Sequence, residues 1–497
     1  MTASTKMRAH VTGAVLAALA LRIYFVFHFP FSDAGDTPIY EELARNWLHR
    51  GVYGIQVYGH LQAVDMRTPG YPAFLAAIYS LFGESARAVM LAQVAVDTLT
   101  CVLAAMIAAL LAPRESRHRV MLAALWLAAL CPFTANYTAV VLTETLAVFL
   151  TTLALLVLME AFAEPAPPAA PVISTQPASG IPAYMRWLLG GIVAGFCTLV
   201  RPESPLILAA AGVVLLAMWL RSRMQQGKLT LTARAGVLMA VGLLLPLLPW
   251  AARNWQTLHR VQFLAPRYSE LPGEFTPHGF YAWTATWLWR MRDVNLVSWN
   301  LDSDEIRVDS IPASAFDSPA ERARVSALLA QYNDMKQMDD TIDAGFASVA
   351  RERTAKRPLR TYVEVPLLRV LSVWFTPRVE MLPFSGHPWP IGAAWDDDPV
   401  DFSVSLGLVL LCIAYCAMAL LGAWRSRASP AAWLIVSYLV IRTAFLTTIE
   451  TPEPRYVVEC FPALLALAAH LWSRTSLPTL AKPLCVLVAA SVPTSRR

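Results

Sequence analysis

Residues 86–112 read ARAVMLAQVAVDTLTCVLAAMIAALLA, an almost unbroken apolar run. A helix needs about 20 such residues to cross the hydrocarbon of a bilayer, where backbone groups cannot stay unpaired. Similar runs recur along the chain at 9–28, 119–133, 136–163, 185–200, 204–220, 234–251, 402–424, 430–448 and 455–473, with weaker ones at 69–83, 362–376 and 479–493. The sequence therefore predicts an all-α polytopic membrane protein with about ten to thirteen membrane-spanning helices.

The composition excludes several other classes of protein. Of the 497 residues, 56% are hydrophobic and only 15% are charged, whereas soluble domains carry about 25% charged residues. The net charge of +5 is small for this length, and no basic block suits nucleic acid. The 7 cysteines lie in or beside apolar runs and lack the spacing of metal ligands. We therefore expect membrane lipids, and no nucleic acid, as partners.

Basic residues indicate how the chain is oriented, because Lys and Arg gather in cytoplasmic loops. Basic clusters alternate with the predicted spans: Lys6 and Arg8; Arg114, Arg117 and Arg119; Arg221, Arg223, Lys228 and Arg234; Arg425 and Arg427; and Arg474. We expect them on the cytoplasmic side of a bacterial inner membrane. The loops that then face the periplasm or the outside are 29–85, 133–138, 201–204, 252–401 and 449–455.

The predicted spans and loops divide the chain into three parts. Residues 1–251 are expected to form an N-terminal transmembrane module that carries the first outer loop, 29–85. Residues 252–401 form an outer region that is mostly helical, and residues 402–497 form a C-terminal transmembrane module. The segment 164–183 is rich in Pro, Ala and Ser, which predicts a cytoplasmic linker without chemistry of its own.

The outer region contains two distinct stretches. Residues 280–300 carry Trp283, Trp287, Trp289 and Trp299. Because indole rings prefer the membrane interface, this stretch is expected to lie along the lipid surface. A polar helical pattern from about 318 to 356 then predicts a small helical outer domain.

Ionisable residues gather where the predicted spans meet the outer loops. They comprise Asp33, Asp36, Asp65, Arg67, Glu144, Arg201, Glu203, Arg253, Glu450, Glu453 and Arg455. Charges near hydrocarbon are costly unless they are paired or functional, so carboxylates and arginines at one depth predict a site. Arginines suit the phosphate of a membrane lipid, and a carboxylate can deprotonate an incoming hydroxyl. The pattern indicates transfer of a group from a lipid phosphate at the outer face.

Each of these residues also has an ordinary structural interpretation. Asp36-Thr37-Pro38 is typical of a helix N-cap, here before an amphipathic helix that ends near residue 49. Glu144 could hydrogen-bond a neighbouring span, and arginines at a boundary extend toward lipid head groups. Tyrosines such as Tyr40 and Tyr71 often only pack. The histidines are scattered, which does not favour a histidine metal site.

The segment 35–48, GDTPIYEELARNWL, with GVY at 51–53, resembles the first outer loop of the C-type glycosyltransferases, the GT-C superfamily. The closer likeness is to bacterial relatives of protein O-mannosyltransferases and of the lipid A aminoarabinose transferase. Further segments agree in order: RTPGYP at 67–72, LTETL at 142–146, PWAARN at 249–254 and EPRY at 453–456 leading to Pro462, with RPE at 201–203 as a weaker match.

This resemblance implies a GT-C type helical bundle with amphipathic juxtamembrane helices in the first outer loop. It also implies an enzyme that moves a sugar from a polyprenyl-phosphate donor to a lipid, glycan or protein acceptor, usually with inversion. The implied catalytic residues are Asp36 and Glu144, the implied phosphate-binding residues are Arg253, Arg455, Arg201 and Arg67, and the candidate substrate-binding residues are Asp33, Tyr40, Tyr71 and Tyr456. Many relatives have an Asp-Glu pair where this chain has Asp36-Thr37, which leaves a divalent cation open and predicts no metal ligands.

Two other classes of protein remain as alternatives. A transporter or lipid flippase would also gather charges between helices, but spread through the midplane and over two repeated halves. A scaffold protein would need no convergent carboxylates and arginines. The position of the charges at one boundary favours the enzyme.

Overall fold

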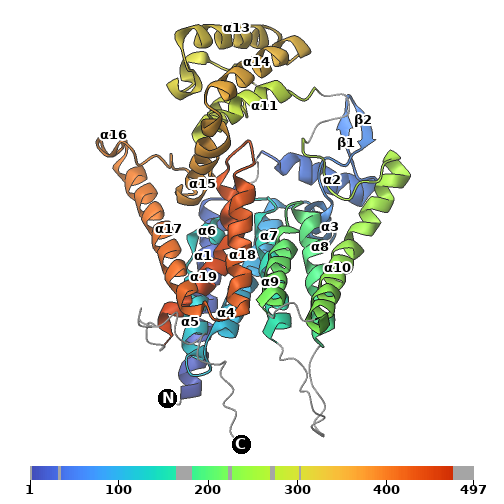
Figure 1. Cartoon of the computed structure of the whole chain (residues 1–497), viewed down its shortest axis with the longest axis vertical. Helices are drawn as coiled ribbons and strands as arrows, with labels where there is room; N and C mark the ends of the chain where they lie inside the picture. Colours follow the sequence, from blue (N-terminus) through green and yellow to red (C-terminus); the bar gives the residue numbers. More distant parts are fainter. Residues whose placement is uncertain are drawn as a thin grey trace, which may run out of the picture.

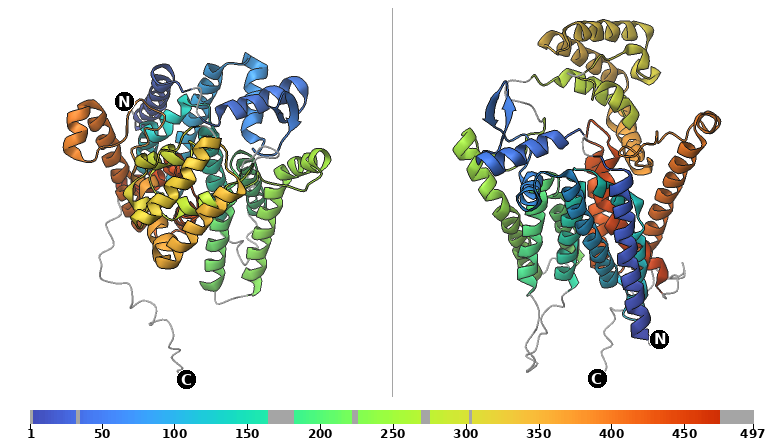
Figure 2. Two further views of the ribbon diagram at one scale, coloured as in Figure 1. Left: turned by 90° about the horizontal axis from the view of Figure 1, so that it is seen from above. Right: turned by 180° about the vertical axis from the view of Figure 1, so that it is seen from behind.

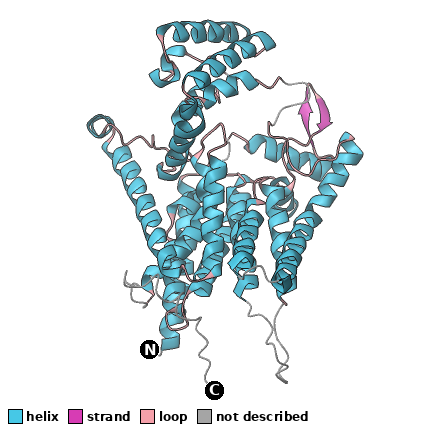
Figure 3. Cartoon of the chain, viewed as in Figure 1, coloured by secondary structure: helices cyan, strands magenta, loops and turns pink. Residues whose placement is uncertain are grey.

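The computed structural model describes residues 3–31, 35–163, 182–221, 226–268, 275–301 and 304–473. Asp33, almost all of the predicted linker 164–183 and the weak candidate span 479–493 lie outside the described residues. The described chain is a helical bundle with one small hairpin (Figures 1 and 3). The upper end of the bundle is the end that carries α2, the hairpin and α11 in Figure 1, and the N-terminus lies at the lower end.

Among the described residues, five helices are long and apolar enough to cross a membrane. They are α1 (Ala3–His28), α4 (Ala86–Leu111), α7 (Glu144–Ala163), α10 (Gln226–Leu258) and α17 (Pro399–Ser426). A sixth span results if α5 (Arg117–Ala129) is joined to α6 (Pro132–Ala135) and η1 (Asn136–Ala139) across a bend of 49°. Shorter apolar helices are α3 (Gly70–Phe82), α8 (Ala183–Val200), α9 (Leu206–Arg221) and α18 (Pro430–Leu446). The predicted helical protein with several membrane spans is confirmed. In the described residues, the number of spans reaches the minimum that we predicted, ten, only if the shorter apolar helices are counted as spans.

The last predicted span, 455–473, is built differently from a regular membrane helix. It begins as a 3-10 helix, η5 (Pro454–Cys460), continues as α19 (Phe461–Ala468), and ends as η6 (Ala469–Trp472). All residues of α19 are buried. This segment therefore lies inside the bundle, and its first turns hold side chains at the upper end that lipid does not reach.

Glycines bring α8 and α10 into close contact. A Cβ on Gly191 would lie 2.3 Å from the carbonyl oxygen of Met239, and one on Gly242 would lie 2.3 Å from that of Leu188. Small residues at such crossings let two helices approach closely without a hydrophobic driving force, as lipid-embedded helices require. This contact fixes the end of α8, where Arg201 follows.

The first loop at the upper end is partly helical and partly extended. Helix α2 (Thr37–Arg50) has apolar residues on one face, and its last turn ends at Gly51 with φ 67°. Strands β1 (Gly54–Val57) and β2 (His60–Ala63) then pair antiparallel. Their two-residue turn has positive φ at Tyr58 and Gly59 (48° and 81°), which matches the twist of a tight hairpin. The sequence prediction contained the helix but not the hairpin.

A small helical domain stands above the bundle (Figures 1 and 2). It contains α11 (His278–Ala285), α12 (Met291–Val297), α13 (Pro319–Met335) and α14 (Asp340–Lys356). Trp283 and Trp287 lie in its core with Phe280 and Phe346. The prediction that 280–300 lies along the lipid surface is therefore wrong for these two tryptophans, because the domain uses them to fill its own interior.

Helix α15 (Val365–Phe375) connects this domain to the bundle, after a π-helical turn, η4 (Arg360–Glu364). Its 11 residues extend roughly 16 Å at 1.5 Å per residue, too short for a bilayer. Arg369 of α15 donates to the carbonyls of Leu288 (2.7 Å) and Ile449 (3.1 Å), and so ties the domain to the loop before η5. Helix α16 (Ile391–Asp397) then leads to α17.

Candidate active site

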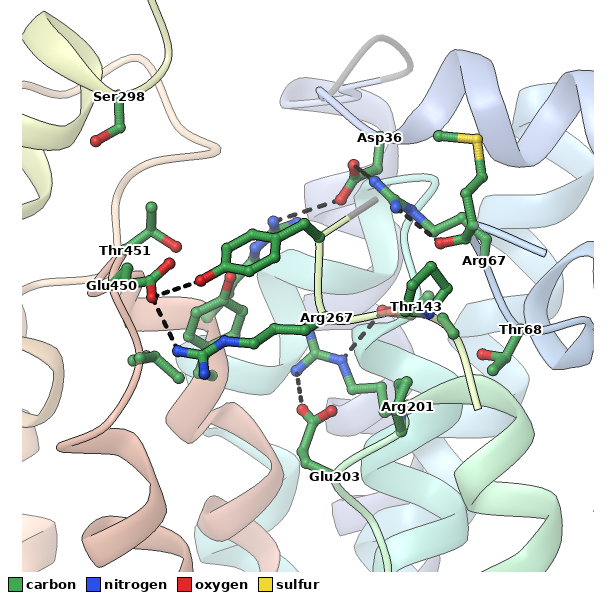
Figure 4. Close-up of a pocket in the computed structure, with 18 of the residues that line it drawn as sticks. Asp36, Arg67, Thr68, Thr143, Arg201, Glu203, Arg267, Ser298, Glu450 and Thr451 are labelled. Carbon is green, nitrogen blue, oxygen red and sulfur yellow. Dashed lines mark hydrogen bonds and ion pairs between the residues drawn. The ribbon is translucent and has the colours of Figure 1, made fainter. Parts of the chain in front are cut away.

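Asp36 lies at the start of α2, at the upper end of the bundle. It occupies the N-cap position with Pro38 in the first turn, as predicted, but its side chain makes no capping hydrogen bond. Instead Thr37 anchors the helix start, since its hydroxyl donates to the carbonyl oxygen of Val141 at 2.9 Å. The Asp36 carboxylate is left free to meet groups from other segments (Figure 4).

Two arginines hold Asp36. Arg67 Nη2 donates to Asp36 Oδ1 at 2.8 Å, and Arg455 Nη2 lies 3.5 Å from Oδ2. The Asp36 side chain is 28% exposed, so solvent still reaches it. Burial acts to raise the pKa of Asp36, but the charges of Arg67 and Arg455 outweigh it and leave the pKa lowered. Asp36 is therefore a carboxylate at neutral pH.

Arg455 also connects Asp36 with Glu144, the first residue of α7. Arg455 Nη1 lies 3.7 Å from Glu144 Oε1, and Arg201 Nη2 lies 3.1 Å from the same oxygen. Glu144 is only 1% exposed, and its Oε2 has no hydrogen-bond partner among the residues that the structure describes. Asp36, Arg67, Glu144, Arg201 and Arg455 thus meet, although they come from widely separated parts of the chain.

A second group of charges, which the sequence analysis did not single out, lies beneath this cluster. Glu459 Oε1 is 3.2 Å from Arg201 Nη1 and 2.9 Å from Arg442 Nη2, and both Glu459 and Arg442 are 1% exposed. Arg442 also lies 3.4 Å from Glu203. Both missed residues are inside apolar runs rather than at loop ends. The signal that could have found them is the cost of a charge within a span.

Arg253 is the predicted phosphate-binding residue that the structure does not bring to the cluster. It donates to the carbonyls of Val64 (2.8 Å) and Tyr53 (2.5 Å), and its guanidinium lies over the rings of Tyr53 and Trp250. These contacts hold the segments that flank the hairpin against α10. Arg253 therefore supports the loop, and we do not assign it a phosphate.

The candidate tyrosines differ in position. Tyr40 and Tyr456 line the cavity next to Asp36. Burial raises the pKa of Tyr40 to about 12, so Tyr40 stays a neutral phenol that can donate a hydrogen bond. Tyr71 is fully buried and donates to Gln93 Oε1 at 2.9 Å, which fits a packing role.

Two cavities meet at the cluster. The first, which we call the arginine cavity, has a volume of about 830 Å³ and is lined by Arg67, Arg201, Arg267 and Arg455 among others. The second, the loop cavity, has a volume of about 680 Å³ and is lined by Arg292, Glu380, Phe384 and His387 among others. Asp36, Trp299 and Arg455 line both cavities. A molecule in either cavity can therefore reach Asp36.

One side of the arginine cavity is closed by an ion pair (Figure 4). Arg267 Nη2 lies 2.8 Å from Glu450 Oε1, and the hydroxyl of Tyr268 donates to the same oxygen at 3.1 Å. Arg267 belongs to the segment that follows α10, and Glu450 to the loop before η5. The two segments therefore form a polar wall opposite Arg67.

The residues at the site do not fit a divalent cation. In the described parts of the chain, no group of three or more His, Cys, Asp or Glu side chains could hold a metal ion. Asp36, Glu144 and Glu459 each have an arginine within 4 Å (3.5, 3.1 and 2.9 Å at the pairs with Arg455, Arg201 and Arg442). Arginines thus occupy the positions from which a cation would neutralise these carboxylates.

Comparison with known proteins gives a distant likeness only. No family model matches the sequence, and no curated protein does so either. A solved structure of the oligosaccharyltransferase from Archaeoglobus fulgidus, in complex with Zn and sulfate, is similar with a TM-score of 0.46 and 15% identity over 93% of this chain. Another of that enzyme, with an inhibitory peptide and a dolichol-phosphate, gives 0.48 and 14% over 95%.

This chain spans about half the length of those chains (48% and 50%). At such identity and TM-score the likeness assigns neither residues nor activity. The candidate function consequently rests on the geometry of the cluster and of the two cavities, and on the sequence resemblance.

Proposed function

We propose that this protein is a membrane glycosyltransferase that transfers a sugar from a polyprenyl-phosphate donor to an acceptor at the outer face of the cytoplasmic membrane. The observation that carries this proposal is that Asp36 and Arg455 meet on the wall that two cavities share, where Arg455 also reaches the buried Glu144. A group-transfer enzyme needs two substrates that meet at one point. A base and a phosphate-binding cation should lie at that point.

The donor phosphate belongs in the arginine cavity. Arg67, Arg201 and Arg455 line it together, and guanidinium groups bind phosphate through paired charge-assisted hydrogen bonds. As the bond between the sugar and the phosphate breaks, negative charge grows on the phosphate oxygens. Arginines already fixed by Glu144 and Glu453 can stabilise that charge without first reorganising.

Asp36 then acts as the base. A phosphate that binds Arg67 and Arg455 competes with Asp36 for these two partners, so donor binding should raise the pKa of Asp36 and strengthen it as a base. The acceptor hydroxyl arrives from the loop cavity and gives its proton to Asp36. The acceptor oxygen bonds to the anomeric carbon as the bond to phosphate breaks, and polyprenyl phosphate leaves. Attack from the opposite cavity corresponds to inversion.

The orientation follows from the basic loops. The N-terminus lies at the lower end of the bundle, away from the cluster (Figure 2), and the basic residues Lys6 and Arg8 precede or begin the first span. Basic residues favour the cytoplasmic side. We therefore place the upper end, with both cavities, on the periplasmic or external side of a bacterial inner membrane.

The decisive test is a transfer assay with purified protein in proteoliposomes. Undecaprenyl-phosphate carrying a radiolabelled hexose or pentose is supplied with bacterial membrane lipids and glycans as acceptors. We expect release of free undecaprenyl phosphate and labelling of an acceptor. If the labelled lipid crosses the bilayer with its sugar–phosphate bond intact, the protein is a flippase and the proposal is wrong.

Replacing Arg67 by Gln should weaken donor binding. Hydrogen bonds to charged groups are worth about 1.5–3 kcal/mol, so we expect the KM for the donor to rise by about 10- to 100-fold. The control is Arg45→Gln, because Arg45 lies on α2, pairs with Glu41 at 3.5 Å and is 40% exposed. An equal change in KM for both variants would contradict the assignment of Arg67 to the phosphate.

The pH dependence should reveal the pairing of Asp36. Because its pKa is lowered, Asp36 stays ionised as the pH falls from 7, and it is protonated only below its ordinary value of 3.8. We therefore expect kcat/KM, which reports the free enzyme, to keep its value down to about pH 5. In the variant Arg67→Gln, Asp36 has lost one of its cationic partners, so the pKa of Asp36 rises. The fall in kcat/KM at acidic pH should therefore begin at a higher pH than in the wild type. An identical profile for both proteins would contradict Asp36 as the base.

A further inference from the structure

We propose that the acceptor is a membrane lipid, whose apolar chain enters between α1 and the upper part of α17. This inference rests on the proposed function, since it concerns the second substrate of the same site. It starts from a third cavity that the transfer mechanism leaves unused.

The third cavity, which we call the portal cavity, has a volume of about 230 Å³. Its walls come from α1, from α6 and η1, from the loop after α15, and from α17. Most of the lining is apolar: Tyr24, Phe25, Phe29, Phe133, Leu382, Val404 and Leu408. Tyr24 is 45% exposed, so the cavity reaches the surface of the bundle that faces lipid.

The portal cavity adjoins the loop cavity at one residue. Phe384 lines both of them, and the loop cavity in turn reaches Asp36 and Arg455. Val379 and Met381, which line the loop cavity, keep this route apolar near Phe384. An apolar chain could therefore lie in the portal cavity while the polar end of the same molecule reaches the base.

Helix α17 leans away from the bundle at its upper end (Figures 1 and 2). Only 22% of its most apolar window is buried, the lowest share among the five long helices. Val404 and Leu408 lie roughly 8 and 14 Å from the first residue of α17 at 1.5 Å per residue, which is within the outer half of a bilayer core of about 30 Å. The portal cavity consequently opens at the level of the outer leaflet.

Two of the described residues that line the portal cavity each have one unpaired polar atom, although their other polar atoms are hydrogen-bonded. Arg378 is 1% and Asn136 is 4% exposed, and within the described part of the chain Arg378 Nε and Asn136 Oδ1 make no hydrogen bond. Both residues line this cavity. Buried polar atoms are nearly always paired. Arg378 Nε can donate to the carbonyl oxygen of a lipid ester or amide, whereas Asn136 Oδ1 can accept only from a donor such as an amide N–H or a hydroxyl.

The charges decide which substrate uses this route. The arginine cavity offers Arg67, Arg201, Arg267 and Arg455 to a phosphate. These arginines outnumber the carboxylates of the same cavity, which are Asp36, Glu203 and Glu450. In the loop cavity the carboxylates of Asp36, Glu380 and Glu453 outnumber Arg292 and Arg455, so a phosphate is repelled there. The donor phosphate therefore sits on the arginine side. Phe445 and Leu446 at the end of α18, and Ile449 just after it, line the same cavity and are available to its chain. The portal cavity is left for the chain of the second substrate, so the acceptor is a lipid rather than a soluble peptide or glycan.

Photolabelling of the full-length protein tests this inference. One sample holds phosphatidylglycerol vesicles with a trace of diazirine in an acyl chain, and the other holds a diazirine-bearing undecaprenyl phosphate. We expect the acyl probe to label the segment 376–384 and α17 near Leu408, and the polyprenyl probe to label 445–449. If the polyprenyl probe labels the portal residues instead, the portal holds the donor and the lipid acceptor is wrong, while the transferase remains.

Matched variants separate a chain in the portal from ordinary bilayer lipid. Val404→Trp fills the cavity, so acyl labelling of 376–384 should fall by about tenfold. Leu410→Trp is the control, because Leu410 lies on the same helix, is 56% exposed and is not among the residues that line the cavity. Equal acyl labelling of 376–384 in both variants would mean that the probe reacts only from the surrounding bilayer lipid, and it would overturn the inference.

A folding defect in Val404→Trp can be recognised independently. Labelling of 445–449 by the polyprenyl probe should stay at the wild-type level if the protein is folded. Leu408→Trp, from the next turn of α17, should repeat the loss of acyl labelling and leave that signal intact. Failure of the wild-type protein to consume any donor would instead refute the proposed function, whatever the portal binds.

Discussion

Replacing Asp36 by Asn should lower the turnover of a polyprenyl-phosphate sugar by about 10²–10⁴-fold, the usual contribution of a well-placed base. The amide keeps the size of the side chain but cannot accept the acceptor's proton. It also removes the charge that Arg67 and Arg455 face at 2.8 and 3.5 Å, so donor binding should hold or tighten. A loss in kcat with an unchanged or lower KM for the donor is therefore expected from initial rates.

The control for this variant is Asp304→Asn, since Asp304 is exposed in the domain above the bundle and lines neither of the two cavities. Its kinetics should match the wild type. Should Asp36→Asn retain most of its kcat, Asp36 would not be the base, and Glu144 would have to be examined in its place.

Replacing Glu459 by Leu should produce the largest change in stability. Glu459 is 1% exposed and compensates Arg201 and Arg442 at 3.2 and 2.9 Å. Removing one partner of a buried pair costs about 3–5 kcal/mol when the remaining charge is left uncompensated. Here the cost should lie at or below the lower end of that range, because Arg442 keeps Glu203 at 3.4 Å and Arg201 keeps Glu144 at 3.1 Å. We expect a marked fall in the melting temperature of the purified protein in detergent, followed by intrinsic fluorescence.

The double variant Glu459→Leu with Arg442→Leu distinguishes the charge from the packing. Apolar replacement of a whole buried pair is often neutral, so the second change should restore part of the lost stability. Recovery should be incomplete because Arg201 also uses Glu459. Glu84→Gln, at a surface pair with His49, should change stability by less than about 0.5 kcal/mol. A double variant less stable than Glu459→Leu alone would contradict the charge argument.

Much of the fold follows from the length of the apolar runs. In a bilayer, a long apolar run such as 86–112 is stable only as a membrane-spanning helix. This run forms α4 (Ala86–Leu111). Shorter runs are less informative, because a run can be buried by neighbours as well as by lipid. The segment 455–473 shows this difference, since all of α19 is covered by protein.

Part of the candidate site was also predictable. Three of the site residues lie at the ends of predicted spans: Asp36, Glu144 and Arg455. Because the outer ends of spans lie at the same depth in the membrane, the sequence predicts that these charges share one depth. Their lateral convergence depends on how the helices pack, which the sequence does not state. Arg253 occupies the same depth, yet its partners are the carbonyls of Tyr53 and Val64.

Residues inside the spans were harder to find. Glu459 and Arg442 lie in apolar surroundings that the span prediction treated as lipid-facing. Trp283 and Trp287 led to the opposite error, because an aromatic residue suits both a membrane interface and the core of a small domain. The type of a residue does not tell whether it faces lipid, lies at the membrane interface or is buried in protein. The groups that contact its side chain in the fold do.

The arginines of the site are paired with carboxylates, and this has a consequence for selectivity. A small free anion, such as inorganic phosphate, would have to separate Arg67 from Asp36 and would gain little in return. A phosphate attached to a long hydrocarbon chain gains the burial of that chain as well. If the proposed function is correct, this pairing of charges therefore favours a phosphate on a lipid over the abundant soluble anions of the surrounding fluid.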